Sequence, residues 1–127
     1  MSKVVIDASA ILALLNKEPG HEIVDSHLPH SIMSTVNLSE TLAVLTEIGI
    51  AHKDAADLVI TLIKEIIPFD EKQAVIAAAL RKNTKSNGLS LGDRACLALA
   101  KELNLSAVTA DKAWANANHS VKVILIR

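Results

Sequence analysis

The sequence predicts an α/β fold in which a parallel sheet is covered on both faces by helices. Short runs rich in apolar and β-branched residues recur along the 127-residue chain, helical patterns separate these runs, and the centres of the runs are apolar. Strands of a parallel sheet that is buried on both faces have such sequences, and the helices between them form the necessary crossovers. Because neither an internal repeat nor a second core is visible, we expect one domain over residues 1–127.

The first half of the chain contains two strands and three helices. In order, we expect a strand over 4–7, helices over 8–16 and 21–28, a strand over 30–34 and a helix over 35–49. VVID at the start is β-branched, and Pro19 with Gly20 stops the first helical pattern. The helix over 35–49 carries apolar residues around almost its whole circumference, which indicates packing on more than one side, and Gly49 ends it.

The second half continues the alternation. We expect a helix over 52–65, a strand over 66–69, helices over 70–82 and 90–103, a strand over 106–109, a short helix or turn over 111–118 and a strand over 121–126. The stretch RKNTKSNG, residues 81–88, is polar and is predicted to be a flexible link into the helix that follows.

Composition limits the functions that the chain can have. The formal net charge is −1, and one Phe and one Trp with no Tyr leave no aromatic platform for stacking on bases. A single cysteine cannot form an internal disulfide. The longest apolar run is seven residues, against the roughly 18 that a membrane span needs. The chain enters its first strand at once, so we expect no signal sequence and a soluble protein in the cytoplasm.

Four carboxylates stand near strand ends or helix starts. Asp7 ends the first strand, Asp111 comes two residues after SAVT, Asp93 opens the helix before SAVT, and Glu40 lies six residues beyond the second strand. Ligands of open α/β sheets bind at the carboxyl ends of the strands, so these acids are candidate site residues.

Each acid also has a structural explanation. Asp7 and Asp111 precede helices, where an aspartate caps free backbone N–H groups, and Ser90 with Asp93 has the spacing of a capping box. Glu40 shares a helical stripe with Val36 and Val44, so a buried carboxylate that needs a partner and a solvated acidic edge are both open.

Together the four acids indicate a cation site. If the sheet brings them to one edge, their mutual repulsion strains the fold unless positive charge is supplied. Ligands that are all oxygen select hard cations, so Mg²⁺ or Mn²⁺ is the expected occupant, and the spacing of Cys and His that zinc requires is absent.

The segments VVIDASAIL, NLSETL, LSLGDRACLALA and VTADKAW, in this order and spacing, resemble the PIN domain, most closely the VapC-type toxins of bacterial toxin–antitoxin pairs. The resemblance covers essentially the whole chain. It implies a three-layer α/β/α sandwich with a five-stranded parallel sheet and a metal-dependent endoribonuclease that uses one or two ions. The acidic positions of the family, catalytic and metal-binding, correspond here to Asp7, Glu40, Asp93 and Asp111.

The resemblance also suggests supporting residues and partners. Ser9 and Thr109 match hydroxyl positions of the family and either orient ligands or cap helices. An RNA substrate such as a structured tRNA or rRNA, a cognate antitoxin that covers the active-site groove, and a homodimer are implied. The helix over 52–65 is a candidate dimer interface, although core packing explains its apolar face equally well.

Several cations near these motifs are candidate contacts for RNA phosphates, and each is also what a solvated surface presents. They are Arg81, Lys82, Lys85, Arg94 and Lys112.

Two alternatives to a nuclease stay open from the sequence. One is a non-catalytic PIN-like interaction domain. The other is a magnesium-binding phosphoacceptor receiver module, which would need adjacent acids after the first strand and a lysine after the last, whereas the chain has Asp7-Ala8-Ser9 and ends at Arg127. No nucleotide-binding glycine motif is present.

Overall fold

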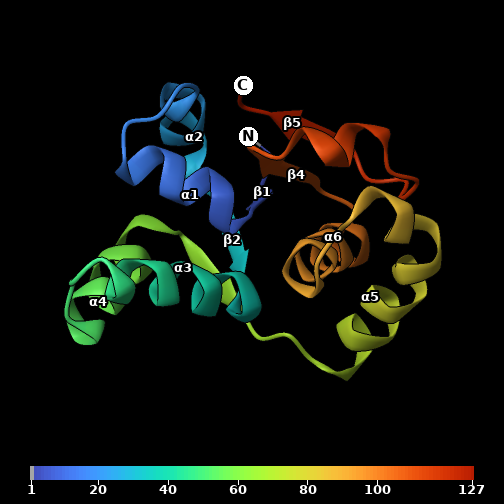
Figure 1. The fold of residues 1–127 in the computed structure, drawn as a ribbon, viewed down its shortest axis with the longest axis horizontal. Helices are drawn as coiled ribbons and strands as arrows, with labels where there is room; N and C mark the ends of the chain where they lie inside the picture. Colours follow the sequence, from blue (N-terminus) through green and yellow to red (C-terminus); the bar gives the residue numbers. More distant parts are fainter. Residues whose placement is uncertain (1) are drawn as a thin grey trace.

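The computed structural model describes residues 2–127, and these form a five-stranded, entirely parallel sheet between two groups of helices (Figure 1). The strand order is β3-β2-β1-β4-β5. The strands are β1 (Val4–Ile6), β2 (Ser31–Ser34), β3 (Glu65–Ile67), β4 (Ser106–Thr109) and β5 (Val123–Leu125). The predicted α/β/α fold with a five-stranded parallel sheet is therefore confirmed.

Six α-helices and three 3₁₀ turns connect these strands within the described part of the chain. They are α1 (Ala8–Leu15), α2 (His21–His27), η1 (Leu28–His30), α3 (Thr35–Glu47), α4 (His52–Leu62), α5 (Glu71–Thr84), η2 (Lys85–Asn87), α6 (Leu91–Leu103) and η3 (Lys112–Asn116). Helices α1 to α4 lie on one side of the sheet and α5 and α6 on the other (Figure 1).

Alternation along the strands divides the core in two. In β1, Val4 and Ile6 pack with the apolar residues of α1, α2 and α4, whereas Val5 faces the opposite way and packs with α6. Successive side chains of a strand point to opposite faces, so a fully buried strand must be apolar at every position. The side chains of Val4, Val5 and Ile6 are all buried, which explains the uninterrupted apolar run.

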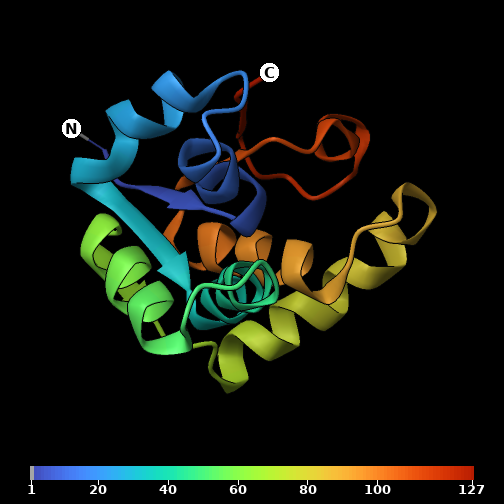
Figure 2. The same cartoon turned by 60° about the vertical axis from the view of Figure 1, so that its left-hand side comes forward.

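Helix α3 occupies a special place because it contacts α1, α4 and α6. In Figure 2 it is seen nearly end-on, with α4 on one side and α5 and α6 on the other. The prediction that this helix packs on more than one side is confirmed. It is the element that links the two helical layers near the carboxyl ends of the strands.

Several predicted boundaries are wrong: β3 and β5 are shorter than predicted, and two helices end at other residues. The α5 helix runs on to Thr84, through half of the stretch that was predicted to be a flexible link, because Leu80 and Thr84 are buried and the Thr84 hydroxyl donates 2.8 Å to the carbonyl of Leu80. The α4 helix ends at Leu62, since buried Ile63 is already extended and the chain turns into β3 at Glu65.

No helix within residues 2–127 is long and apolar enough to cross a membrane.

Candidate functional site

The carboxyl ends of β1 and β4 are adjacent where the strand order reverses. From β1 the chain moves outward through β2 to β3 and later returns to pair β4 with the other side of β1. Such a reversal is where open α/β sheets bind their ligands. Asp7 follows β1 directly and Asp111 lies two residues after β4, so the topology brings these two acids to one edge.

Asp7 is a buried carboxylate held on several sides. Its Oδ1 accepts from the backbone N–H of Ala10 at 2.9 Å, and its Oδ2 accepts from Thr109 Oγ1 at 2.6 Å. The Ser9 hydroxyl lies 2.8 Å and 2.9 Å from the two carboxylate oxygens. Burial raises the pKa of Asp7 to about 6, the bonds from Thr109, Ala10 and Ser9 oppose that rise, and nearby Asp93 adds to it.

Ser9 and Thr109 do more than contact Asp7. The Ser9 Oγ accepts from the backbone N–H of Ala110 at 3.0 Å, and the Thr109 Oγ1 accepts from the backbone N–H of Asp111 at 3.0 Å. Each hydroxyl therefore ties the Asp7 carboxylate to the segment that carries Asp111. The sequence left open whether these hydroxyls orient ligands or cap helices, and in the structure they bond the Asp7 carboxylate and two backbone N–H groups that precede η3.

The predicted helix caps are formed. The backbone N–H of Ser90 donates to Asp93 Oδ2 at 2.9 Å and the N–H of Asp93 donates to Ser90 Oγ at 3.2 Å, which completes the capping box. Asp111 Oδ1 accepts from the N–H of Ala113 at 2.9 Å. A cap occupies one carboxylate oxygen and fixes the side-chain rotamer. The other oxygen of Asp93 and of Asp111 has no hydrogen-bond donor among residues 2–127.

Of the two interpretations that the sequence left open for Glu40, the structure supports the exposed one and not the buried one. The buried stripe of α3 consists of Asn37, Thr41 and Leu45, so the stripe through Glu40 and Val44 faces outward. Glu40 sits beside the first turn of α6, where Asn37 Nδ2 donates 2.9 Å to its Oε1.

Asn37 is the residue that the sequence reasoning missed. It is 1% exposed, and its Nδ2 also donates 3.0 Å to the carbonyl of Gly92. Its position three residues before Glu40 was the available signal, because residues at i and i+3 share a helix face.

All four predicted acids line one cavity of about 260 Å³: Asp7, Glu40, Asp93 and Asp111. Ser9 and Asn37 line it as well. These residues come from the start of α1 with its N-cap Asp7, from α3, from α6 and from the segment after β4, so only the tertiary fold assembles them. The arrangement concentrates negative charge and oxygen donors in one partly enclosed space.

The donor set of this cavity fits a hard divalent cation. The acids offer oxygen ligands only, and the raised pKa of Asp7 reflects burial and a neighbouring negative charge without a compensating positive one. Among residues 2–127, no group of three or more His, Cys, Asp or Glu side chains is already arranged as ligands around one point. The fit therefore rests on the chemistry of the oxygen donors that share the cavity.

The predicted phosphate contacts lie outside the lining of this cavity: Arg81, Lys82, Lys85, Arg94 and Lys112. Four of them are exposed, but Arg94 is only 8% exposed and its Nη1 donates 3.0 Å to the carbonyl of Ala77. The interpretation of Arg94 as a phosphate contact is therefore corrected, because its guanidinium joins α6 to α5.

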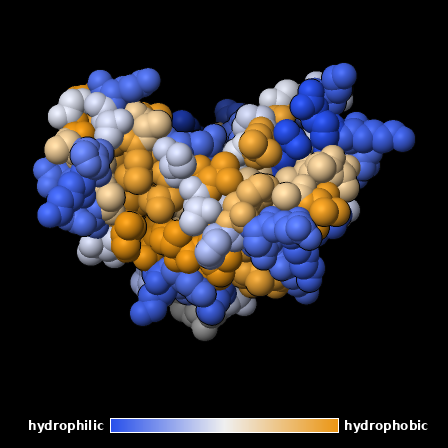
Figure 3. Space-filling view, turned by 90° about the horizontal axis from the view of Figure 1, so that it is seen from below, coloured by the Kyte–Doolittle hydropathy of each residue, from blue (hydrophilic) through white to orange (hydrophobic). Residues whose placement is uncertain are grey.

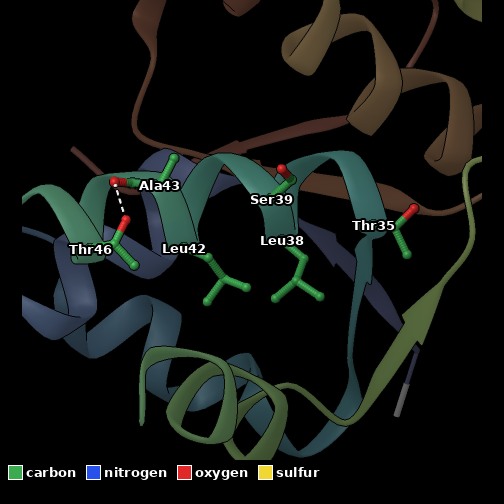
Figure 4. A pocket seen from close by; sticks show the side chains of 6 residues that line it. All are labelled: Thr35, Leu38, Ser39, Leu42, Ala43 and Thr46. Carbon is green, nitrogen blue, oxygen red and sulfur yellow. Dashed lines mark hydrogen bonds between the residues drawn. The ribbon is translucent and has the colours of Figure 1, made fainter. Parts of the chain in front are cut away.

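A larger hollow of about 380 Å³ lies along α3 away from the acids (Figure 4). Leu38 and Leu42 project into it, and Thr35, Ser39, Ala43 and Thr46 complete its lining. It holds no titratable group, so it offers an apolar contact surface and no chemistry of its own.

Comparison with known proteins identifies a family for the chain. The PIN domain family model matches residues 4–119 of the chain. No curated protein matches it.

Solved structures share the fold. A toxin–antitoxin complex from Klebsiella pneumoniae has a TM-score of 0.78 and 18% identity, with 98% of each chain covered. VapC20 of Mycobacterium tuberculosis, described as a sarcin-ricin loop cleaving toxin, has a TM-score of 0.74 and 18% identity over 94% of this chain and 99% of that one. FitAcB from Neisseria gonorrhoeae has a TM-score of 0.69 and 24% identity over 97% of each chain. At these identities the likeness establishes the fold.

Proposed function

This chain belongs to the PIN domain family, and from that premise we propose that it is a metal-dependent endoribonuclease that acts as the toxin of a toxin–antitoxin pair. The observation that carries the proposal is the single cavity into which four elements, distant in sequence, each place one carboxylate. The receiver module is not supported, because the order β3-β2-β1-β4-β5 differs from the 2-1-3-4-5 order of that fold.

In the proposed reaction, Asp7, Asp93 and Asp111 hold Mg²⁺ or Mn²⁺, as one ion or two. A bound ion supplies charge stabilisation to a phosphoryl oxygen and lowers the pKa of a water. Glu40 is a further ligand or orients the attacking water. Water loses a proton to solvent and adds to the phosphorus, the bond from phosphorus to the leaving ribose oxygen breaks, and that oxygen takes up a proton from solvent.

The supporting residues fix geometry in advance. Ser9 and Thr109 hold the Asp7 carboxylate by hydrogen bonds, and the caps at Asp93 and Asp111 hold theirs. Preset donors and ligands save the reorganisation that would otherwise add to the barrier. Capping and ion binding are compatible in Asp93 and in Asp111, because the cap uses one carboxylate oxygen and leaves the other for the ion.

The substrate must be recognised without base stacking. Exposed Arg81, Lys82, Lys85 and Lys112 are the proposed phosphate contacts. With these cations and no aromatic platform, we propose recognition of a folded RNA, tRNA or rRNA, by backbone shape. Two bound divalent ions would change the formal net charge of −1 by +4, so the acidic balance does not prevent RNA binding.

We also propose a cognate antitoxin and a homodimer in the cytoplasm. Structures with the same fold include the VapBC complex from Salmonella typhimurium, bound to DNA, which supports a partner protein. Figure 3 shows apolar side chains gathered over much of one face of the molecule, which supports association. Ile60 on α4 is 51% exposed, whereas Val59 is buried, so only part of the apolar surface of α4 is used by the core. A monomer by light scattering at micromolar concentration would count against the dimer.

The decisive test is cleavage of a folded RNA by purified wild type with Mg²⁺, compared with Asp7→Asn and Asp93→Asn of unchanged fold. We expect cleavage by wild type only, and none in EDTA. Cleavage that persists in EDTA or in both variants would indicate contaminating nuclease. A wild type that binds RNA or an antitoxin without cleaving would identify the non-catalytic domain. Sequencing RNA 5′ ends after brief induction in cells would then locate the target.

A further inference from the structure

The side chain of Asn37 is a buried amide with an unusual pattern of bonds. Its Nδ2 donates two hydrogen bonds near the acidic cavity, one within α3 to the Glu40 carboxylate at 2.9 Å and one across to the Gly92 carbonyl of α6 at 3.0 Å. Its Oδ1 is buried and has no donor among residues 2–127. Two acceptors on the nitrogen side leave only one orientation of the amide, so the oxygen cannot take the nitrogen's place.

This pattern is poorly explained by stability alone. A buried polar atom without a partner costs roughly 1–3 kcal/mol. The Gly92 carbonyl lies in the first turn of α6, where a helical carbonyl already accepts a bond from the residue four positions later. An apolar side chain in the same place would avoid the unmet oxygen. What the amide alone provides is a fixed donor for the carboxylate of Glu40.

Gly92 supplies the space in which that carboxylate lies. A Cβ built at this position would overlap the carboxylate of Glu40, while the backbone of Gly92 is not in the left-handed region. Glycine at this position therefore leaves the space that the Glu40 carboxylate occupies, and a side chain here would displace that flexible carboxylate. Gly92 directly precedes Asp93, so the approach brings Glu40 next to the acid that opens α6.

We propose that Asn37 and Gly92 are positioning residues that together place the carboxylate of Glu40 in the acidic cavity. Glu40 is exposed and sits on a different helix from Asp93, so without these two contacts its side chain would be free to leave the cavity. The amide of Asn37 clamps it against the first turn of α6, and the missing side chain of Gly92 lets it come close. The catalytic consequence of this arrangement rests on the proposed nuclease function, but the arrangement itself does not.

The activity test uses Asn37→Ala, Gly92→Ala and Glu40→Ala, alone and with each positioning variant combined with Glu40→Ala. Misplacing a catalytic group by about 1 Å can cost on the order of 100-fold, so we expect Asn37→Ala and Gly92→Ala each to lower kcat roughly 10–100-fold with KM nearly unchanged. If they act through Glu40, neither lowers the activity of Glu40→Ala further.

A matched control separates positioning from loss of a buried amide. Gln73 on α5 is 2% exposed, donates to a backbone carbonyl, that of Pro68, and also has a buried oxygen without a donor in the described chain. Gln73→Ala should lower stability as Asn37→Ala does and leave kcat and KM unchanged. Gly92→Ala removes no polar group, so it tests positioning even if Asn37→Ala folds poorly.

A second measurement reads the bond itself in metal-free protein. The side-chain amide of Asn37 gives its own pair of signals in a ¹⁵N–¹H correlation spectrum, identified by their loss in Asn37→Asp. We expect Glu40→Ala and Gly92→Ala to shift this pair and Gln73→Ala to leave it in place.

The outcomes separate the two ideas. Signals of Asn37 that do not respond to Glu40→Ala, or losses of kcat that multiply with that of Glu40→Ala, would overturn the positioning role. A wild type without nuclease activity would refute the proposed function, and the amide signals would still decide whether Asn37 and Gly92 position Glu40.

Discussion

The hydroxyl of Thr109 donates a hydrogen bond of 2.6 Å to Oδ2 of Asp7, and both side chains are buried. The bond joins the carboxyl end of β4 to the residue that follows β1. It therefore couples the central strand β1 and its neighbour β4 through the most buried acid of the candidate site. Its energy and the charge of its acceptor can both be measured.

Removal of this hydroxyl should destabilise the protein. We expect Thr109→Val to lower the free energy of unfolding by about 1–3 kcal/mol, because a buried bond to an ionised group is lost and the N–H of Asp111 loses its acceptor. Thr109→Ser keeps the hydroxyl and should cost less than Thr109→Val. Urea denaturation at pH 8 in EDTA measures both, and equal losses in the two variants would contradict the role of the bond.

The stability of metal-free protein should fall as pH rises from about 4 to 6. The pKa of Asp7 is about 6 in the folded protein against 3.8 as its ordinary value, so the folded state holds the proton more tightly in this range. The contribution of this group is most favourable below pH 4, is lost progressively up to pH 6 and then levels off. A shift of about two pKa units corresponds to roughly 3 kcal/mol.

The difference between wild type and Asp7→Asn isolates this effect from the other carboxylates. Urea denaturation in EDTA at several pH values should show wild type losing stability relative to the variant between pH 4 and 6. A difference that stays constant across this range would mean that Asp7 does not titrate as its burial requires.

Mg²⁺ or Mn²⁺ should raise the melting temperature of wild type. An ion that binds only the folded state stabilises it by about 2.7 kcal/mol at a hundred times its Kd. Asp7→Asn should abolish most of the rise, whereas Glu47→Gln, which removes an exposed acid of α3 outside the cavity lining, should retain it. Differential scanning fluorimetry measures the melting temperature of wild type and of the two variants. Equal rises in melting temperature in all three proteins would indicate nonspecific ion binding.

Replacement of Arg94 should affect stability and not RNA binding, whereas replacement of Arg81 should affect RNA binding and not stability. Arg94→Ala removes a buried side chain and its bond to the carbonyl of Ala77, so we expect a loss of about 2 kcal/mol in unfolding free energy and unchanged RNA affinity.

Arg81→Ala changes an exposed cation of α5 and should alter stability by less than about 0.5 kcal/mol. If Arg81 contacts a phosphate, the slope of log affinity against log salt becomes shallower by about 0.7–0.9. Fluorescence anisotropy with labelled RNA measures this slope, and an unchanged slope would remove Arg81 from the proposed contacts.

Much of the architecture was predictable because it depends on local patterns. The apolar run at β1, the capping spacing of Ser90 and Asp93, and the glycine at the end of α3 each reflect physics that acts within a few residues. The extension of α5 to Thr84 was not predictable in this way, because it depends on burial of Leu80 and Thr84 by segments distant in the chain.

The candidate site likewise has features that the sequence determines and features that only the tertiary structure determines. Composition and spacing alone determined which side chains were available: four acids at strand ends and helix starts, two hydroxyls, and few aromatics. Only the tertiary structure decided that Glu40 is exposed, that Arg94 is buried, and that Asn37 holds Glu40 beside Gly92. The rotation of α3 about its axis and its approach to α6 set the two outcomes for Glu40 and Asn37, and the packing of α6 on α5 sets that for Arg94.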